Sequence, residues 1–242
     1  MSLSNKTILI TGAAGGLGSA LALQCANFGA ELVLLDKDRR GLSSLSDQLT
    51  EQGLAAPGLY PMDLAGAGVD DFDDLAGILE SEYGGLHALI HCALDFEGLQ
   101  PLDQVQPQDW LRSMQVNVNA PWLLSCALLP LLKKSQSGRL FFLLDELETV
   151  TGAYWGAYGA GKAALTGLVR QFSASLNHSN VLVRGINPGA MRTGFRAKVY
   201  HAENPMDQPE PKAAAGEIAA MLIGDLSGDD LMVNLSENRT EP

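Results

Sequence analysis

Short apolar runs alternate with longer mixed stretches along most of the chain. The apolar runs predict strands at Lys6–Thr11, Glu31–Asp36, Leu59–Asp63, Leu86–Ala93, Arg139–Leu144, Val181–Asn187 and near Leu231–Leu235. The stretches between them predict helices to about Phe28, to about Gln52, over Asp70–Tyr83, Pro107–Lys134 and Tyr158–Leu176, and at about Ala213–Ile223. Strands that are apolar throughout are typical of a sheet covered on both faces, and strands that alternate with helices imply right-handed crossovers between parallel strands. The pattern therefore predicts a doubly wound, Rossmann-like parallel α/β sheet in one domain over residues 1–242.

The alternation stops after Thr193, where a polar, proline-containing stretch runs to about Lys212. Ligands of doubly wound folds bind beyond the carboxyl ends of the strands, and this stretch follows such an end. We therefore expect residues 193–212 to form a substrate lid. The side chains in and beside the lid that are candidates for a pocket wall are Phe195, Tyr200, Met206, Arg192, Arg196 and Lys198.

A glycine-rich turn stands between the first strand and the first helix, where Thr11–Gly18 reads T-G-A-A-G-G-L-G. Glycines let the backbone turn tightly and lie close to a pyrophosphate, and the free N–H groups at the start of a helix favour an anion. Because a strand precedes the turn and a helix follows it, the turn predicts a dinucleotide site rather than a purely structural bend.

Asp36 ends the second strand, 18 residues after Gly18. A carboxylate at this place accepts hydrogen bonds from the ribose diol of adenosine and repels a 2′-phosphate. The sequence therefore favours NAD over NADP as the cofactor, although the nearby Lys37, Arg39 and Arg40 could still tolerate NADP.

Together with the motifs that follow them, these features resemble the short-chain dehydrogenase/reductase family over residues 5–194. Gly12, Gly16 and Gly18 take the glycine places of that family's TGxxxGxG motif. Asp63 takes the place of its adenine-contacting acid, and Pro188-Gly189 with Thr193 matches the segment that holds the nicotinamide. The cofactor contacts implied by the resemblance are Thr11, Gly12, Gly16, Leu17, Gly18, Asp36, Asp63, Ala93, Tyr158, Lys162, Pro188, Gly189 and Thr193.

The chemistry implied by this resemblance is hydride transfer coupled to proton transfer on a small alcohol or carbonyl substrate. The family's Tyr-x3-Lys signature reads Tyr158-Gly-Ala-Gly-Lys162, and Tyr158 would be the general acid/base. A phenol has a pKa near 10 and needs a neighbouring cation to work near neutral pH. Lys162 lies one helical turn further on the same face and would supply that charge. Asn117 matches the family's asparagine and would hold a water of the proton relay.

Two sites depart from the family pattern. Asp145 stands thirteen residues before Tyr158, where the family has its catalytic serine. An ionised carboxylate accepts hydrogen bonds and donates none, so Asp145 could replace the serine only if an apolar pocket kept it protonated. The family's Asn-Asn-Ala-Gly reads His91-Cys92-Ala93-Leu94, and Leu94 adds bulk where a glycine lets the backbone lie close to the cofactor.

The charge balance and the cysteines narrow the partners. The chain has 28 acidic and 16 basic residues and a net charge of −12, without the cationic footprint that nucleic acid requires. The uncharged stretch Met114–Leu132 holds polar residues and two prolines, which favours a buried helix over a membrane span. Three isolated cysteines, Cys25, Cys92 and Cys126, suit a reducing cytoplasm and give no metal pattern. We expect a cytoplasmic protein with no metal, nucleic-acid or membrane partner.

Three functions remain open at this point. The first is a working NAD-dependent oxidoreductase for a small molecule, which the set of Tyr158, Lys162 and Asn117 favours. The second is a degenerate family member that binds a dinucleotide with little or no turnover and serves in regulation or assembly, for which Asp145 and Leu94 argue. The third is an enzyme whose Asp145 performs other acid/base work, such as dehydration or isomerisation. The resemblance also implies a homodimer or homotetramer.

Overall fold

Parallel strands form one seven-stranded sheet in the computed structural model, which describes residues 2–224 and 230–235. The strand order is β3-β2-β1-β4-β5-β6-β7, and every neighbouring pair is parallel. The strands are β1 Thr7–Thr11, β2 Glu31–Asp36, β3 Gly58–Pro61, β4 Ala88–His91, β5 Gly138–Leu143, β6 Val181–Asn187 and β7 Met232–Asn234. The predicted doubly wound sheet is confirmed. Its order reverses between β1 and β4, so a ligand crevice is expected at the carboxyl ends of these two strands.

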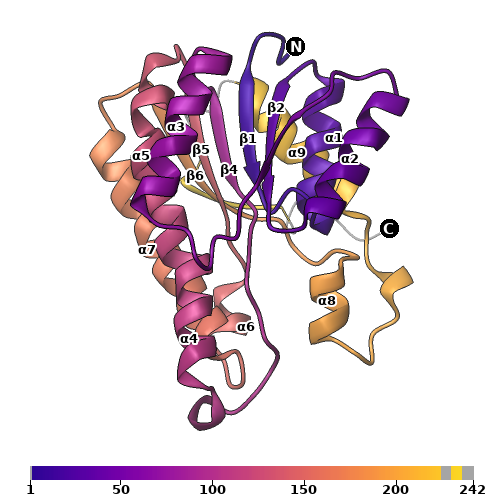
Figure 1. The fold of residues 1–242 in the computed structure, drawn as a ribbon. Helices are drawn as coiled ribbons and strands as arrows, with labels where there is room; N and C mark the ends of the chain where they lie inside the picture. The colour runs from indigo at the N-terminus through magenta and orange to yellow at the C-terminus, as the bar shows by residue number, and fades with distance from the viewer. Residues whose placement is uncertain (1, 225–229, 236–242) are drawn as a thin grey trace.

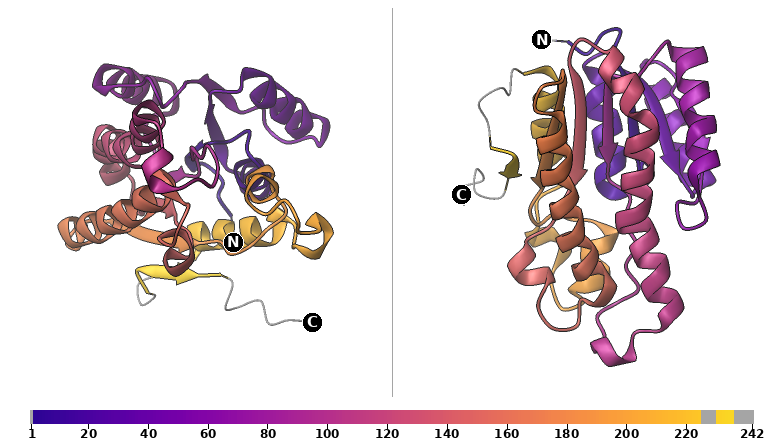
Figure 2. Two further views of the ribbon diagram at one scale, coloured as in Figure 1. Left: turned by 90° about the horizontal axis from the view of Figure 1, so that it is seen from below. Right: turned by 90° about the vertical axis from the view of Figure 1, so that its left-hand side faces the viewer.

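Helices cover both faces of the sheet (Figure 1). One face carries α1, α2 and α9, and the other carries α3, α5 and α7, as Figure 2 also shows. The helices are α1 Gly16–Asn27, α2 Arg39–Glu51, α3 Val69–Tyr83, α4 Pro107–Met114, α5 Ala120–Lys134, α6 Leu147–Val150, α7 Gly156–Leu176, α8 Gly194–Val199 and α9 Pro211–Ile223, with 3₁₀ turns at Leu102–Gln104 and Pro205–Asp207.

The core consists of two apolar layers separated by the sheet. Successive side chains of a strand point to opposite faces, so Ile8 and Ile10 of β1 join the layer beneath α1 and α9, whereas Leu9 joins the layer beneath α3 and α5. All three are at most 1% exposed. This two-sided burial explains why the strands read as continuous apolar runs.

The stretch Pro107–Lys134, predicted as one helix, contains a break. A π-helical turn at Gln115–Asn119 joins α4 to α5. Among the described residues this stretch alone has the length and hydropathy of a membrane span, and half of its most apolar window is buried inside the fold. Leu124 and Leu128 of α5 are fully buried against the sheet, so the stretch packs as a core helix.

Three short elements extend beyond the carboxyl ends of the strands: α4, α6 and α8 (Figure 1). A third, smaller apolar cluster lies among them and includes Phe96, Val150, Trp155, Tyr158 and Val199. The helix predicted at Tyr158 begins two residues earlier, at Gly156, and places Tyr158 in its first turn. The sheet therefore fixes one wall of a site, and these short elements form the other.

Candidate active site

A cavity of about 790 Å³ lies at the carboxyl ends of the strands, within the size range of small-molecule sites. The residues that line its β1–β2 end include Gly12, Gly15, Gly16, Leu17, Gly18, Asp36 and Asp63. Those that line its β4–β6 end include Ala93, Leu94, Asp145, Glu146, Tyr158, Lys162, Pro188, Gly189 and Thr193. With the exception of Thr11 and Asn117, which lie just behind the wall, every predicted site residue lines this one cavity.

The glycine-rich turn is shaped by backbone crowding. Gly12 has a φ of +65°, and a Cβ on it would lie 2.7 Å from the Cα of Ala93. A Cβ on Gly18 would lie 2.1 Å from the carbonyl oxygen of Gly12. Only glycine fits at either place, so the turn closes tightly and leaves the start of α1 open toward the cavity. This is the cradle that a pyrophosphate requires.

Thr11 and Ala93 join this turn to the end of β4. The hydroxyl of Thr11 accepts hydrogen bonds from the N–H groups of Cys92 and Ala93, each at 3.2 Å. Thr11 is fully buried, so it holds the turn against β4 rather than facing a ligand. Ala93 lines the cavity as predicted.

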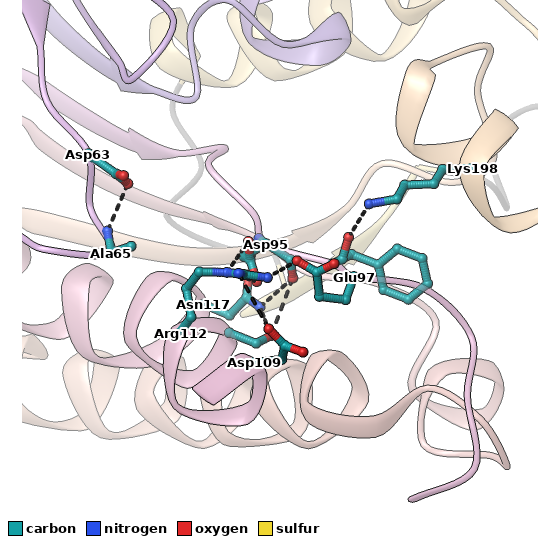
Figure 3. Close-up of polar contacts among 10 residues, drawn as sticks. Asp63, Ala65, Asp95, Glu97, Asp109, Arg112, Asn117 and Lys198 are labelled. Carbon is teal, nitrogen blue, oxygen red and sulfur yellow. Dashed lines mark hydrogen bonds and ion pairs between the residues drawn. The ribbon is translucent and has the colours of Figure 1, made fainter. Parts of the chain in front are cut away.

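Two carboxylates mark the adenosine end. Asp36 accepts hydrogen bonds from the N–H groups of Ala14 at 3.0 Å and Asp38 at 2.9 Å, and it still borders the cavity. Asp63 lies two residues beyond the end of β3 and accepts one from the N–H of Ala65 at 3.1 Å (Figure 3). Both carboxylates are therefore held by backbone in the places that the sequence predicts.

Tyr158, Lys162 and Asp145 meet at the other end. The Tyr158 hydroxyl donates to Oδ2 of Asp145 at 2.7 Å, and the Lys162 ammonium donates to the carbonyl of Leu143 at 2.7 Å. Oδ1 of Asp145 accepts the N–H of Glu146 at 2.8 Å. Both oxygens of this carboxyl group therefore accept hydrogen bonds.

The burial of these groups changes their protonation. Burial, and after it the charge of Asp145 and the hydrogen bond to it, raise the pKa of Tyr158 well above its ordinary value of 10. Burial lowers the pKa of Lys162 from 10.5, while Asp145 opposes that change. The phenol is thus held in its protonated form, first by its burial and then by the neighbouring carboxyl group of Asp145.

Asn117 lies in the π-helical turn between α4 and α5 and is clamped by the segment after β4. Its Oδ1 accepts the N–H of Asp95 at 3.0 Å, and its Nδ2 donates to the Asp95 carbonyl at 2.8 Å and to Ser113 Oγ at 2.9 Å (Figure 3). Both N–H groups of the amide are used within the protein. The side chain therefore fixes this turn to the end of β4, and the water of a proton relay would need another donor.

Behind Asp95 lies a charged group. Arg112 of α4 donates to the Asp95 carboxylate at 3.3 Å and also pairs with Glu97 and Asp109 (Figure 3). The Arg112 side chain is 36% exposed, whereas that of Asp95 is 13% exposed. This pairing, absent from the sequence prediction, holds the residue that clamps Asn117.

The segment after β6 lies against the glycine-rich turn. Gly189 has a φ of +74°, and its N–H donates to Oδ1 of Asn187 at 3.0 Å. Thr193 caps α8 by accepting the N–H of Arg196 at 3.2 Å, and its methyl group would lie 2.9 Å from a Cβ on Gly16. Pro188, Gly189 and Thr193 thus close the cavity from the side opposite β4.

At the end of β4, the residues that differ from the expected family motif make contacts of their own. His91 is buried, bonds Ser125 Oγ at 2.9 Å and stacks on Phe142 at 4.8 Å between ring centroids. Burial lowers the pKa of its imidazole to about 3 and raises that of the Cys92 thiol. Leu94 is 39% exposed and lines the cavity without filling it.

Aromatic rings surround Tyr158, and the sequence prediction missed one of them. Phe96, Trp155 and Phe195 have ring centroids 5.2–5.7 Å from that of Tyr158. Phe96 follows β4 in a segment without a motif, so nothing in the sequence pointed to it. Trp155 lines the cavity, whereas the adjoining Tyr154 is 57% exposed and lies outside the cavity wall.

Residues 193–212 contribute only partly to the wall. Of the lid candidates, Phe195, Arg196 and Tyr200 line the cavity. Arg196 is engaged with Glu203 through two hydrogen bonds of 2.5 and 2.8 Å. The others lie elsewhere: Arg192 pairs with Glu210, Lys198 donates to the Phe96 carbonyl and Met206 is 72% exposed.

Comparison with known proteins identifies the family. The family model for short chain dehydrogenases matches residues 6–204. The uncharacterized oxidoreductase YciK of Escherichia coli K12 is 34% identical over 209 residues, which cover 86% of this chain and 82% of YciK. A protein from Pseudomonas syringae described as a short chain dehydrogenase is 36% identical, with a TM-score of 0.90 over 96% of this chain and 95% of the other. Another from Shigella flexneri 2a, complexed with NADP, is 32% identical, with a TM-score of 0.90 over 96% and 97%. The chain therefore belongs to the short-chain dehydrogenase family.

Proposed function

We propose that this protein is a nicotinamide-dependent oxidoreductase that transfers hydride to or from a small organic substrate, at a carbon bonded to a heteroatom. The observation that carries the proposal is the single cavity that joins the glycine-rich turn and Asp36 to Tyr158 and Lys162. When bound, the nicotinamide dinucleotide supplies or accepts the hydride. The alcohol and carbonyl pair is the general case for this family.

The cofactor would be held by groups along the whole cavity. Backbone N–H groups at the start of α1 would bind the pyrophosphate, and Asp36 and Asp63 would bind the adenosine. Pro188, Gly189 and Thr193 would border the nicotinamide. The fit rests on Gly12 and Gly18, where a Cβ would collide with backbone and close the cradle.

Proton transfer would fall to Tyr158. The raised pKa keeps the phenol protonated at neutral pH, and the protonated phenol is the form that gives a proton to the substrate in the direction of reduction. Lys162 holds a buried positive charge beside it, with its Nζ 5.4 Å from the centroid of the Tyr158 ring. Asn117 would position this site through Asp95 rather than through direct contact with substrate.

The form of the cofactor depends on the groups at the end of β2. The relative from Shigella flexneri is complexed with NADP, which favours the phosphorylated form. In this chain a 2′-phosphate would meet the Asp36 carboxylate, and the adjoining Lys37, which also lines the cavity, would offset part of that repulsion. We propose NAD as the preferred form, bound more tightly than NADP.

Thermal unfolding with NAD⁺, NADP⁺ and their reduced forms tests these proposals. A cofactor at one hundred times its dissociation constant should add about 2.7 kcal/mol to the free energy of unfolding, a rise of a few degrees in Tm. In the Asp36→Asn variant, the rises in Tm produced by NAD and by NADP should differ less than they do in the native chain. Absence of a shift with every form would contradict the proposed function, and tighter binding of NADP by the native chain would overturn the NAD preference. Binding without turnover would instead support the degenerate alternative.

We also propose that α8 covers the substrate end, since Phe195, Arg196 and Tyr200 line it.

A homodimer or homotetramer is proposed from the family resemblance and from α5, whose exposed surface includes Trp122 at 47% and Cys126. Sedimentation of the native chain and of Trp122→Glu tests this assembly: the variant should dissociate, and a native monomer would contradict the proposal.

A further inference from the structure

The catalytic end of the cavity offers a carboxylate where reduction of a carbonyl needs a hydrogen-bond donor. Asp145 lies 2.7 Å from the Tyr158 hydroxyl, and both of its oxygens accept hydrogen bonds. The Thr151 hydroxyl is used within α6, where it donates to the Leu147 carbonyl, whereas Thr149 borders the cavity. A substrate oxygen beside the phenol would therefore lie next to the Asp145 carboxyl group, which accepts hydrogen bonds.

An acceptor at this position acts differently on two kinds of substrate. Hydride addition to C=O builds negative charge on oxygen, and a carboxylate beside it raises the energy of that transition state. A protonated C=N carries a positive charge that the carboxylate attracts, so the carboxylate favours binding of an imine as its iminium cation. The iminium N–H also donates a hydrogen bond, which is what a carboxylate accepts. The local chemistry at Asp145 therefore fits nitrogen better than oxygen.

The walls of this end also suit a cation. Trp155 and Phe195 line the cavity beside Tyr158, with ring centroids 5.7 and 5.2 Å from that of Tyr158, and aromatic faces attract positive charge. Glu146 brings a second carboxylate to the wall, with an Asn187 amide 3.4 Å from its Oε2. Acceptors and aromatic faces thus converge on the space in front of Tyr158.

Two cations face the same space and have to be weighed against these acids. Arg196 is held by Glu203 through a bidentate pair, so its charge is already balanced. Lys162 is fully buried, is bonded to the Leu143 carbonyl and offsets the charge of Asp145. Two acids, Asp145 and Glu146, lie on the wall, and Glu203 lies behind them. Their three negative charges exceed the two positive charges of Arg196 and Lys162 by one before substrate binds.

We infer that the substrate of this site is an imine, reduced as its iminium cation to an amine, with Asp145 as the residue that binds the charged nitrogen. The inference rests on the proposed oxidoreductase function. The iminium carbon accepts a hydride from the reduced nicotinamide cofactor, so a C–H bond forms and the π-electron pair of C=N becomes the nitrogen lone pair. A neutral imine takes up one proton first, which Tyr158 donates and solvent restores. The products are an amine and the oxidised cofactor.

Bicyclic probes of matched size test the substrate class in the holoenzyme. They are 3,4-dihydroisoquinoline (an imine), N-methyl-3,4-dihydroisoquinolinium (a permanent iminium) and 1-tetralone (a ketone), each assayed with NADH and NADPH. The native enzyme should reduce the imine with kcat/KM at least about tenfold above the ketone, as loss of one charge-assisted hydrogen bond would give. The N-methyl iminium has no N–H, so it tests the attraction between the charges alone, and it should also be reduced faster than the ketone. Asp145→Ser should lower that ratio by at least the same factor. Equal or faster reduction of the ketone by the native enzyme would overturn the inference.

A binding measurement removes the dependence on turnover. Calorimetry with N,N-dimethyl-1,2,3,4-tetrahydroisoquinolinium, a cation that cannot be reduced, should show tighter binding to the cofactor complex than 1-tetralone shows. Asp145→Ser and Asp145→Asn should each weaken the cation and not the ketone. Glu148→Gln is the matched control, because Glu148 is exposed on the same segment and lies outside the cavity wall. A cation affinity unchanged in both Asp145 variants, with their Tm preserved, would contradict the inference.

The two proposals fail differently. If no nicotinamide cofactor raises the Tm of the native chain, the oxidoreductase function itself is wrong. If a cofactor binds and the ketone is preferred in both assays, only the assignment of the imine substrate is wrong. If a cofactor binds and no probe is reduced, the calorimetric preference for the cation decides.

Discussion

The phosphate end of the cavity is built from glycines that the backbone requires, whereas its catalytic end is built from large side chains that hold one another. At the first end a Cβ on Gly18 would lie 2.1 Å from the Gly12 carbonyl oxygen. At the second end Tyr158 is bonded to Asp145, and His91 to Ser125. Backbone collisions tolerate no other residue, but a side-chain contact can be exchanged for another if both partners fit.

This contrast explains where the chain departs from its family. The glycine-rich turn keeps the family pattern, while the ends of β4 and β5 do not. His91, where the family resemblance implies an asparagine, bonds a hydroxyl and stacks on an aromatic ring, and Asp145, where it implies a serine, bonds the tyrosine. Side-chain contacts of this kind hold the shape of the catalytic end.

Removal of the phenolic hydroxyl should have the largest effect on the catalytic end. Tyr158→Phe should lower kcat for 3,4-dihydroisoquinoline or 1-tetralone by about 10²–10⁴-fold, the usual contribution of a general acid. Reduction of N-methyl-3,4-dihydroisoquinolinium needs no proton and should fall much less. Steady-state kinetics would show the difference. Tyr154→Phe, an exposed tyrosine four residues earlier, should change neither rate, and an active Tyr158→Phe would remove Tyr158 from proton transfer.

A single methyl group should disrupt the phosphate end. Gly18→Ala forces the Gly12 carbonyl to move, so we expect cofactor-dependent stabilisation to disappear, with Tm lowered by several degrees for a cost of about 1–3 kcal/mol. Gly77→Ala is the matched control, because Gly77 lies in α3 with nothing within 4 Å of its added Cβ. That change should stabilise by about 0.4–1 kcal/mol. Normal cofactor binding by Gly18→Ala would show that the turn is not a cradle.

The burial of His91 should make the stability of the protein depend on pH. Burial lowers the pKa of this imidazole from 6.5 to about 3, so between these values the unfolded chain binds a proton that the folded chain excludes. The free energy of unfolding therefore falls as pH drops below 6.5, by up to about 1.4 kcal/mol per pH unit from this group. Urea unfolding of His91→Asn at several pH values should show a shallower slope. The exposed His178→Asn should leave the slope unchanged, and an equal slope in His91→Asn would show that His91 does not titrate in this way.

The sequence predicted the sheet because its strands are buried on both faces and read as unbroken apolar runs. It did not predict the π-helical turn at Gln115–Asn119, since one extra residue in a helical turn leaves the apolar pattern nearly unchanged. It also missed α6 and α8, of four and six residues, which are too short for a periodic pattern to develop.

The candidate site was predictable where a motif has fixed spacing and unpredictable where partners come from distant segments. The Tyr158 and Lys162 pair follows from the resemblance to the family's signature, and the glycine-rich turn follows from its place between a strand and a helix. That Asp145 would bond Tyr158, and that Phe96 would pack against its ring, depends on how the segments after β4 and β5 fold against α7. The side chain of Asn117 is held by Asp95 and Ser113, partners from the segment after β4 and from α4 that no motif marks.

Arg112 offers the mildest test of how side chains hold the catalytic end. Its ion pair with Asp95 lies at the surface, where such pairs contribute about 0–1 kcal/mol, so Arg112→Gln should lower the free energy of unfolding by less than about 1 kcal/mol. Because Asp95 clamps both polar atoms of Asn117, kcat should fall by a few-fold while KM stays constant, and Arg112→Lys should restore part of it. Arg170→Gln, on the exposed side of α7, is the control. An unchanged kcat in Arg112→Gln would show that the backbone contacts of Asp95 hold Asn117 without the ion pair. The position of Asn117 would then depend on backbone contacts, as the glycine-rich turn does.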